Sequence, residues 1–234
     1  MDLTAAILAG GLGTRLRGVV ADRPKVLAPV GGRPFLALLL DQLADAGIRK
    51  VVLLTGHRGE QVREAFGEKY EEMRLIYAEE PTPLGTAGAL RRALPLVTGT
   101  RVVLLNGDSY CDVRIDELYD WHCRQKAAAS LGLVEVPDVS RFGQVRRDRI
   151  GRVIAFEEKG QAKGPGWINA GVYLIERKLL AELPVDRPLS LERDVLPDWV
   201  SRRLVYGMEC GKRFIDIGTP ESYSEAEAFF STVR

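Results

Sequence analysis

Glycine and basic residues gather in one stretch near the start of the chain. Residues 8–16 read Leu-Ala-Gly-Gly-Leu-Gly-Thr-Arg-Leu, and Pro24-Lys25 follows shortly after. Glycine permits unusual backbone dihedral angles and lets main-chain N–H groups approach a phosphate closely. Arg15 and Lys25 add two cations beside the glycines. The combination predicts a phosphate-binding loop; the alternative is a tight turn followed by two solvated basic residues.

Two familiar nucleotide-binding motifs do not fit this loop. The dinucleotide fingerprint requires a third glycine at position 16, where Leu16 stands, and the acidic residue expected after a second strand is missing. The P-loop requires Gly-Lys-Ser or Gly-Lys-Thr, which is also missing. An NAD-dependent oxidoreductase is therefore a weaker alternative, and the loop indicates another class of phosphate-binding protein.

The first half of the chain alternates between short apolar runs and amphipathic segments. The runs predict strands at residues 3–9, 50–55, 74–78 and 101–106, and the segments predict helices at 35–47, 61–70 and 86–94. Nearly continuous apolar runs are typical of strands that are buried on both faces of a parallel sheet. The glycine loop would then leave the carboxyl end of the first strand, where open α/β sheets bind their ligands.

The second half of the chain has a different order of predicted strands and helices. It predicts helices at residues 115–125, 191–199 and 220–230, strands at 128–136, 144–147, 153–158 and 167–176, and a strand pair at 204–208 and 214–216. The close spacing of these strands favours antiparallel pairing. The fold class is therefore α/β, with a Rossmann-like, mostly parallel central sheet flanked by helices and a smaller antiparallel portion. No linker or repeat divides the chain, which predicts a single domain over residues 1–234.

Composition excludes several classes of protein. The 234 residues carry 33 Lys and Arg against 32 Asp and Glu, without the basic excess of a nucleic-acid binder. Three scattered cysteines are too few for a disulfide framework or a zinc site. The longest apolar runs fall far short of the roughly 20 residues that cross a bilayer, and the Met-Asp start lacks the basic segment of a secretion signal. We therefore expect a cytoplasmic protein that binds neither membrane nor nucleic acid.

Six segments in order along the chain resemble the signature sequences of one enzyme family, the sugar-1-phosphate nucleotidylyltransferases. They are residues 8–25, Pro-Leu-Gly-Thr-Ala-Gly at 83–88, Asn-Gly-Asp at 106–108, Phe-Glu-Glu-Lys at 156–159, Asn-Ala-Gly at 169–171, and Phe-Ile-Asp-Ile-Gly-Thr-Pro at 214–220. The resemblance implies the nucleotide-diphospho-sugar transferase type of fold. Residues 1–110 would bind the nucleotide and residues 111–234 the sugar phosphate. Residues 141–143, 167–171 and 214–223 look most like the D-glycero-α-D-manno-heptose 1-phosphate guanylyltransferases.

That resemblance implies a reaction in which a sugar 1-phosphate attacks the α-phosphorus of a nucleoside triphosphate and releases pyrophosphate. The expected substrates are GTP and the heptose 1-phosphate, and the product GDP-heptose would serve surface polysaccharide biosynthesis. Catalytic roles fall to Arg15, Lys25 and Asp108. Nucleotide binding is assigned to Leu8, Ala9, Gly10, Gly11, Gly13, Thr14, Glu80, Gly85 and Thr86. Sugar-phosphate binding is assigned to Gly143, Glu158, Lys159 and Asn169.

Two carboxylates are candidate metal ligands under the same resemblance. Asp108 and Asp216 each end a predicted strand. Carboxylate and phosphate oxygens suit Mg²⁺, which prefers oxygen donors and keeps several waters. A turn cap is the alternative role for a strand-end aspartate. We therefore expect Mg²⁺ as the cofactor.

Glu80 is the residue on which the choice of base depends. An ionised carboxylate can accept both the N1–H and N2–H of guanine, whereas uracil and thymine present one N–H flanked by carbonyl oxygens. Neighbouring Glu79 could play the same part, and both could instead be solvated loop residues. Mannose-1-phosphate guanylyltransferases and uridylyl or thymidylyl relatives therefore stay as alternatives.

Two further possibilities complete the predictions. The same fold could serve as a non-catalytic nucleotide-sugar sensor, although Asp108, Lys159 and Asp216 are all present. Trp121 and Trp199 lie in helical patterns and are assigned to the core or to a subunit contact. A homodimer is therefore kept among the expected assemblies. His57 and His122 are given no chemistry.

Overall fold

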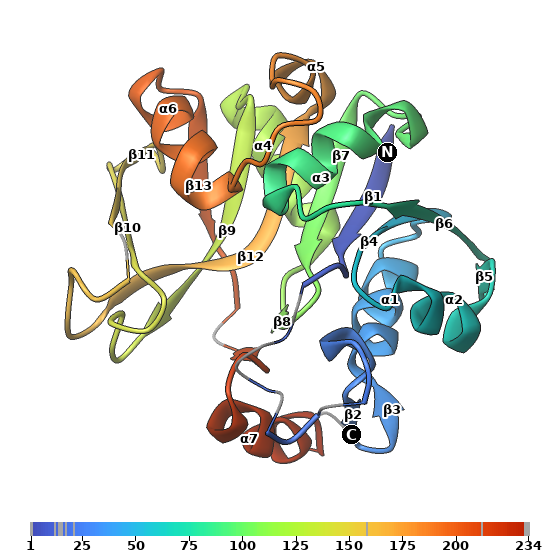
Figure 1. The fold of residues 1–234 in the computed structure, drawn as a ribbon. Coiled ribbons are helices and arrows are strands. Elements are labelled where there is room, and N and C mark those ends of the chain that lie inside the picture. The colour runs from blue at the N-terminus through green and yellow to red at the C-terminus, as the bar shows by residue number, and fades with distance from the viewer. Residues whose placement is uncertain are drawn as a thin grey trace.

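The computed structural model describes residues 2–11, 13, 16, 18–20, 22–157, 159–211 and 213–231. Three residues with predicted roles, Thr14, Arg15 and Glu158, lie outside these residues. The main element is an eight-stranded sheet in the order β13-β9-β12-β7-β1-β4-β6-β5 (Figure 1). Its strands are β1 Leu3–Leu8, β4 Lys50–Thr55, β5 Lys69–Tyr70, β6 Met73–Glu79, β7 Arg101–Asn106, β9 Ala129–Val136, β12 Gly166–Glu176 and β13 Val205–Glu209. The sheet thus takes strands from both halves of the chain.

The middle of this sheet is parallel, as the apolar runs predict. β1 pairs in parallel with β4 and β7, and β4 pairs in parallel with β6. β12 is antiparallel to both β7 and β9, and β13 returns in parallel beside β9. The predicted fold class, a mostly parallel sheet joined to an antiparallel portion, is confirmed.

Helices cover both faces of the sheet and divide the core into two layers. Successive residues of β1 alternate, so that Ala5 and Ile7 face one layer and Ala6 the other. The first layer receives α1 Phe35–Asp45, α2 Gly59–Phe66, α4 Ile115–Gln125 and α7 Pro220–Ser231. The second receives α3 Gly85–Ala93, α5 Arg177–Ala181 and α6 Leu196–Ser201. Trp199, predicted for the core or a subunit contact, is buried in the second layer.

Smaller sheets lie at the margins of the central one. The hairpin of β10 Gln144–Arg147 and β11 Val153–Glu157 projects at the left of Figure 1. β8 Ser109–Cys111 pairs with β14 Phe214–Asp216, and β2 Pro29–Val30 pairs with β3 Arg33–Pro34. Helix α7 lies below β8 and contacts both β14 and β2. In the part of the chain that the structure describes, no helix is long and apolar enough to cross a bilayer.

Three predicted elements are corrected by the structure. The strands at 204–208 and 214–216 do not pair with each other, because the first joins β9 and the second joins β8. The helix predicted at 61–70 ends at Phe66, since Gly67 takes a positive φ and the chain then enters β5. The helix predicted at 191–199 is a π-type turn, Leu191–Val195, followed by α6. Pro197 has no N–H to donate, so regular helical bonding is interrupted there.

Candidate active site

A cavity of about 530 Å³ opens at the carboxyl end of the parallel strands. Its lining comes from the segments that follow β1, β4, β6 and β7, together with the start of α3. Seven residues predicted to bind nucleotide are among the lining residues: Leu8, Ala9, Gly10, Gly11, Glu80, Gly85 and Thr86. Lys25 and Asp108 also line it, whereas Gly13 is not among the lining residues.

Sheet register brings these segments together. Leu8 is level with Leu54 on one side and with Asn106 on the other, so the chain leaves three neighbouring strands at the same height. Backbone bonds extend the alignment past the strand ends: Ala9 N donates to Leu54 O, and Glu80 N donates to Thr55 O. The convergence of loops is therefore a direct result of parallel pairing, as expected for α/β ligand sites.

Two glycines of the cavity wall are required by close backbone packing. A Cβ at Gly107 would lie 2.0 Å from Leu8 O, and a Cβ at Gly85 would lie 2.5 Å from Leu189 O. Gly85 also has a φ of +70°, a conformation that side chains disfavour. These contacts explain the glycines of the Asn-Gly-Asp and Leu-Gly-Thr segments as conditions for closing the cavity wall.

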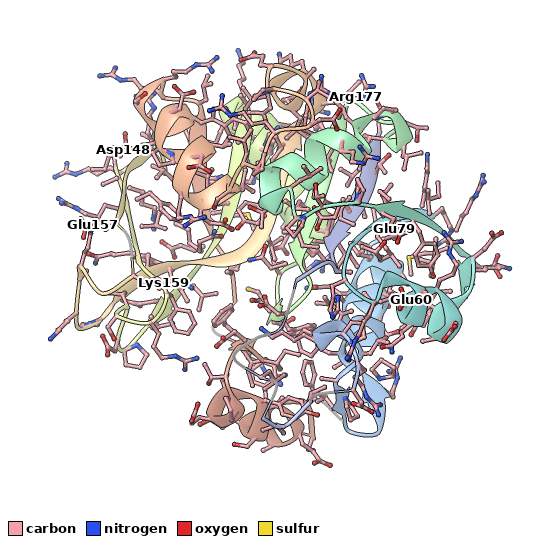
Figure 2. All side chains as sticks on the ribbon, in the orientation of Figure 1. Glu60, Glu79, Asp148, Glu157, Lys159 and Arg177 are labelled. Carbon is pink, nitrogen blue, oxygen red and sulfur yellow. The ribbon has the colours of Figure 1, made fainter. Side chains whose placement is uncertain are left out.

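Glu80 holds the loop before α3 in place. Its Oε2 accepts a hydrogen bond from Leu84 N at 2.8 Å, so the carboxylate spans the intervening turn. Burial raises the pKa of the Glu80 carboxyl above its ordinary value. Glu79, the alternative base contact, is exposed and does not line the cavity (Figure 2). Of these two glutamates, only Glu80 therefore lines the cavity.

Lys25 and Asp108 form an ion pair at the edge of the cavity. Lys25 Nζ donates to Asp108 Oδ2 at 2.6 Å, although 83 positions separate the two residues. The lysine side chain is only 12% exposed, whereas the aspartate is 40% exposed. Ser109 Oγ donates to the other oxygen of Asp108 at 3.1 Å. An ammonium group and a carboxylate are thus held at one edge of the cavity, both oriented by neighbouring groups.

Pairing of β8 with β14 places Asp216 next to Asp108. Ser109 is level with Asp216, and Ile217 N donates to Asp108 O at 2.8 Å. Asp216 accepts hydrogen bonds from Arg141 Nη2 and from Gly218 N, each at 3.2 Å. Asp216 at the end of β14 and Asp108 just before β8 are therefore brought near each other by strand pairing.

The donor set of these two aspartates fits a hard cation. Among the described residues, no group of three or more histidine, cysteine, aspartate or glutamate side chains could hold a metal ion. Two carboxylates leave most coordination positions of a cation to water and phosphate oxygens. One or two carboxylates together with water and phosphate oxygens are the ligands that Mg²⁺ usually has in proteins.

The three described residues of the predicted sugar site lie outside the cavity lining. Gly143 ends a turn closed by a bond from its N–H to Val139 O, and its φ is +84°. Lys159 is exposed and follows β11, on the side of the molecule where the hairpin projects (Figure 2). Asn169 uses both ends of its amide inside the protein, with Tyr173 Oη at 2.7 Å and Gly171 N at 3.1 Å. One N–H donor and the oxygen of this amide are thus engaged within the protein, and its role in sugar binding stays a prediction.

Sequence reasoning assigned no chemistry to the two histidines, and the structure separates them. His57 is exposed and lines the cavity after β4. His122 is buried, with Nδ1 at 2.9 Å from Ser130 Oγ and Nε2 at 3.3 Å from Glu176 Oε1. Burial lowers the pKa of His122, so its neutral form is favoured and its role is structural.

Comparison with known proteins defines the class. Residues 4–232 match the family described as nucleotidyl transferase, and the chain belongs to that family. Relatives similar to it include sugar-1-phosphate guanylyltransferases. The D-glycero-α-D-manno-heptose 1-phosphate guanylyltransferase of Aneurinibacillus thermoaerophilus is 37% identical over 225 residues, covering 96% of this chain and 97% of that enzyme. The mannose-1-phosphate guanylyltransferase of Mycobacterium tuberculosis is 34% identical, covering 97% of this chain and 64% of that longer enzyme.

A solved structure agrees with this placement. The crystal structure of HddC from Yersinia pseudotuberculosis complexed with GMP-PN has a TM-score of 0.86 and 32% identity to this chain. The match covers 97% of this chain and 99% of that one. The family and fold that the sequence segments predict are therefore confirmed.

Proposed function

We propose that the protein transfers a guanylyl group from GTP to D-glycero-α-D-manno-heptose 1-phosphate, giving GDP-heptose and pyrophosphate. The observation that carries the proposal is the cavity itself, with a glycine-rich wall and an aspartate–lysine pair at its edge. Relatives with 37% and 34% identity over nearly the whole chain carry the name of that activity. The cytoplasmic location and the homodimer remain predictions from the sequence.

The proposed chemistry is an in-line displacement at phosphorus. A phosphate oxygen of the sugar 1-phosphate forms a bond to the α-phosphorus while the bond to the β-phosphate oxygen breaks, and pyrophosphate leaves with that electron pair. Two anions must meet, so positioning and charge neutralisation carry most of the catalysis. Lys25 is assigned to the α-phosphate, and the N–H groups of Gly10 and Gly11 to the triphosphate. Arg15, outside the described residues, is assigned to the pyrophosphate leaving group.

Asp108 and Asp216 are the residues that would hold Mg²⁺. The bound ion would supply positive charge against the phosphate oxygens as negative charge shifts toward the leaving group. Lys159 is assigned to the phosphate of the incoming sugar. Its place beyond the cavity lining is consistent with a second substrate that approaches from the β10–β11 side.

A substrate matrix tests the proposal. GTP, UTP, dTTP, ATP and CTP are each combined with heptose, mannose, glucose and N-acetylglucosamine 1-phosphates, and pyrophosphate release is measured with Mg²⁺. The expected result is the highest kcat/KM with GTP and the heptose 1-phosphate. Mannose 1-phosphate is the second candidate, because the Mycobacterium tuberculosis relative is named for it. A best rate with UTP or dTTP would contradict the base assignment, and tight nucleotide binding without turnover would indicate a sensor.

Replacing Lys159 by alanine is expected to raise KM for the sugar 1-phosphate about tenfold, with GTP affinity changed less than about twofold. The physical reason is that the exposed ammonium acts as a point charge on one phosphate only. Initial-rate kinetics with each substrate varied in turn measure both constants. Lys163→Ala is the matched control, because Lys163 is another exposed lysine in the same loop. Weaker GTP binding with an unchanged sugar KM would reverse the assignment.

Replacing Glu80 by glutamine is expected to raise KM for GTP with little change for UTP, at a cost of about 1–3 kcal/mol in GTP recognition. A glutamine oxygen can still accept the bond from Leu84 N, so the loop should keep its shape. Its NH₂ group would then face the two donors of guanine. The GTP-to-UTP ratio of kcat/KM is the measurement, with exposed Glu79→Gln as control. An unchanged ratio in an active Glu80→Gln protein would remove Glu80 from base recognition.

A further inference from the structure

The start of helix α3 is held by a distant segment, residues 189–192, which precedes α6 and runs beside α3 (Figure 1). Ala87 N and Gly88 N donate to Leu189 O at 3.0 and 3.3 Å, and Leu189 N donates in return to Leu84 O at 2.8 Å. At its N-cap residue, Leu84, the helix has no side-chain cap among the described residues. The N–H groups of its first turn therefore find their acceptor in this distant segment.

The side chains of Thr86 and Glu192 add to these backbone contacts. Thr86 Oγ1 accepts a hydrogen bond from Leu191 N at 2.6 Å and donates to Glu192 Oε2 at 3.2 Å, although 106 positions separate Thr86 from Glu192. Ser190 Oγ donates to the same carboxylate oxygen at 3.3 Å. Thr86 lines the cavity, whereas Glu192 is not among the lining residues. Glu192 thus holds a residue of the cavity wall from behind.

Strand β12 binds the other oxygen of the Glu192 carboxylate. Tyr173 Oη donates to Glu192 Oε1 at 2.9 Å and accepts from Asn169 Nδ2 at 2.7 Å. Burial, with the adjacent Glu192 charge second, raises the pKa of Tyr173 well above its ordinary value, so the phenol keeps the proton that it donates. β12 lies inside the central sheet, between β9 and β7. The carboxylate therefore joins the start of α3 to an inner strand of the sheet.

Close packing makes the start of α3 follow the position of this segment. A Cβ at Gly88 would lie 2.6 Å from Arg187 O, so the two backbones are in direct contact. Leu191 and Leu196, on either side of the turn that carries Glu192, are fully buried in the second core layer. Binding groups must be held within a few tenths of an ångström to keep their geometry, so the groups that hold a cavity wall affect ligand affinity.

We propose that Glu192 is a positioning residue for the nucleotide: it anchors the start of α3 to Tyr173 and so fixes the cavity wall at Gly85 and Thr86. The proposal rests on the proposed function, in which this cavity takes GTP and Glu80 meets the base. Glu80 and Glu192 hold neighbouring parts of the same wall, one from inside the cavity and one from outside.

This assignment predicts which part of the nucleotide depends on Glu192. The wall at the start of α3 continues from the loop that Glu80 holds through Leu84 N. The triphosphate is assigned instead to the N–H groups of Gly10 and Gly11, which follow β1. A displaced α3 should therefore weaken contacts with the base and leave those with the triphosphate in place.

The test compares GTP with inorganic tripolyphosphate as probes of Glu192→Met. Methionine keeps an unbranched side chain of similar length but offers no carboxylate oxygen to the two hydroxyls. The Kd for GTP is expected to rise about tenfold, and the Kd for tripolyphosphate to change less than about twofold. Calorimetry with Mg²⁺ and without sugar phosphate measures both constants. A loss of folded protein would instead lower the binding of both probes alike, and thermal melting checks the fold.

Three further variants define the path of the effect. Tyr173→Phe removes one hydroxyl that does not line the cavity, and it should raise the Kd for GTP at least about threefold without adding to Glu192→Met in the double variant. Glu192→Gln should bind GTP within about threefold of wild type, because its oxygen can accept from Tyr173 and its NH₂ group can donate to the Thr86 hydroxyl. Asp194→Asn is the matched control, since this exposed carboxylate of the same turn accepts from Ser190 N at 2.7 Å. It should bind both probes as wild type does.

Two results would overturn the proposal: wild-type GTP affinity in folded Glu192→Met or Tyr173→Phe, or an equal loss of GTP and tripolyphosphate affinity. If Glu192→Met does not fold, Tyr173→Phe decides, because it removes a single oxygen atom. Failure of the proposed function shows separately, as an absence of wild-type turnover in the substrate matrix. The binding test needs no turnover, and it is run with the nucleotide that wild type binds best.

Discussion

Replacing Asp108 by asparagine is expected to lower Mg²⁺-dependent turnover by about 10²–10³-fold. The change removes one anionic oxygen ligand with almost no change of shape. It also leaves the Lys25 ammonium, now 2.6 Å from Asp108 Oδ2, without its carboxylate partner. Glu80, the proposed base contact, is a separate residue of the cavity lining, so nucleotide binding without metal should change far less. The measurements are kcat over a Mg²⁺ titration and nucleotide affinity by calorimetry.

Ser109→Ala is the matched control for this variant. Ser109 Oγ orients Asp108 through a single bond at 3.1 Å but supplies no charge. It should lower turnover by less than about tenfold. Near-normal turnover in Asp108→Asn would remove this carboxylate from the metal site, and Asp216 alone would then have to hold the ion.

Replacing Lys25 by methionine is the second large effect, a loss of about 10²–10³-fold in kcat. Methionine keeps the length and apolar stem of the side chain and removes only the charge. The Lys25 side chain is 12% exposed, so another cationic side chain from the protein surface cannot easily reach its position. The Asp108 carboxylate would also face the substrate phosphates with one cation fewer. Single-turnover rates measure the chemical step apart from product release.

Arginine at the same position should not restore activity. Its planar fork is larger than an ammonium group and binds phosphate with a different geometry. Lys159→Ala provides the contrast, since it should act on the sugar 1-phosphate and leave the chemical step at saturation largely unchanged. A Lys25→Met protein with normal single-turnover rates would show that this ammonium is structural.

Local sequence patterns determined the elements that carry the site. Continuous apolar runs predict β1, β4 and β7 to within one residue at either end, because a strand buried on both faces must be apolar at every position. Helix α4 is predicted with the bounds that it has. The glycine loop after β1 and the aspartate after β7 could also be placed from sequence. Each of these features can be recognised from residues that lie close together in the sequence.

Tertiary structure decided which partners meet. β13 and β14 follow each other closely along the chain and still pair with different strands, since each completes a sheet edge formed by a distant segment. Lys25 and Asp108 lie in segments that follow β1 and β7, and these two strands pair side by side in the sheet. The register of the sheet therefore produces the ion pair, and no local pattern encodes it.

The hydrogen bonds from Asn169 to Tyr173 and from Tyr173 to Glu192 show the same limit most clearly. Asn169 stands in a segment that the sequence singles out, yet Glu192 lies in a helix-like stretch with no distinguishing pattern. It reaches Tyr173 because the π-type turn before Pro197 packs against β12 and α3. The sequence by itself determined that the protein is an α/β nucleotidyltransferase with a glycine-rich segment after its first strand and two strand-end aspartates. Only the folded chain decided which side chains these segments meet, because partners such as Tyr173 and Glu192 or Lys25 and Asp108 come from separate parts of the sequence.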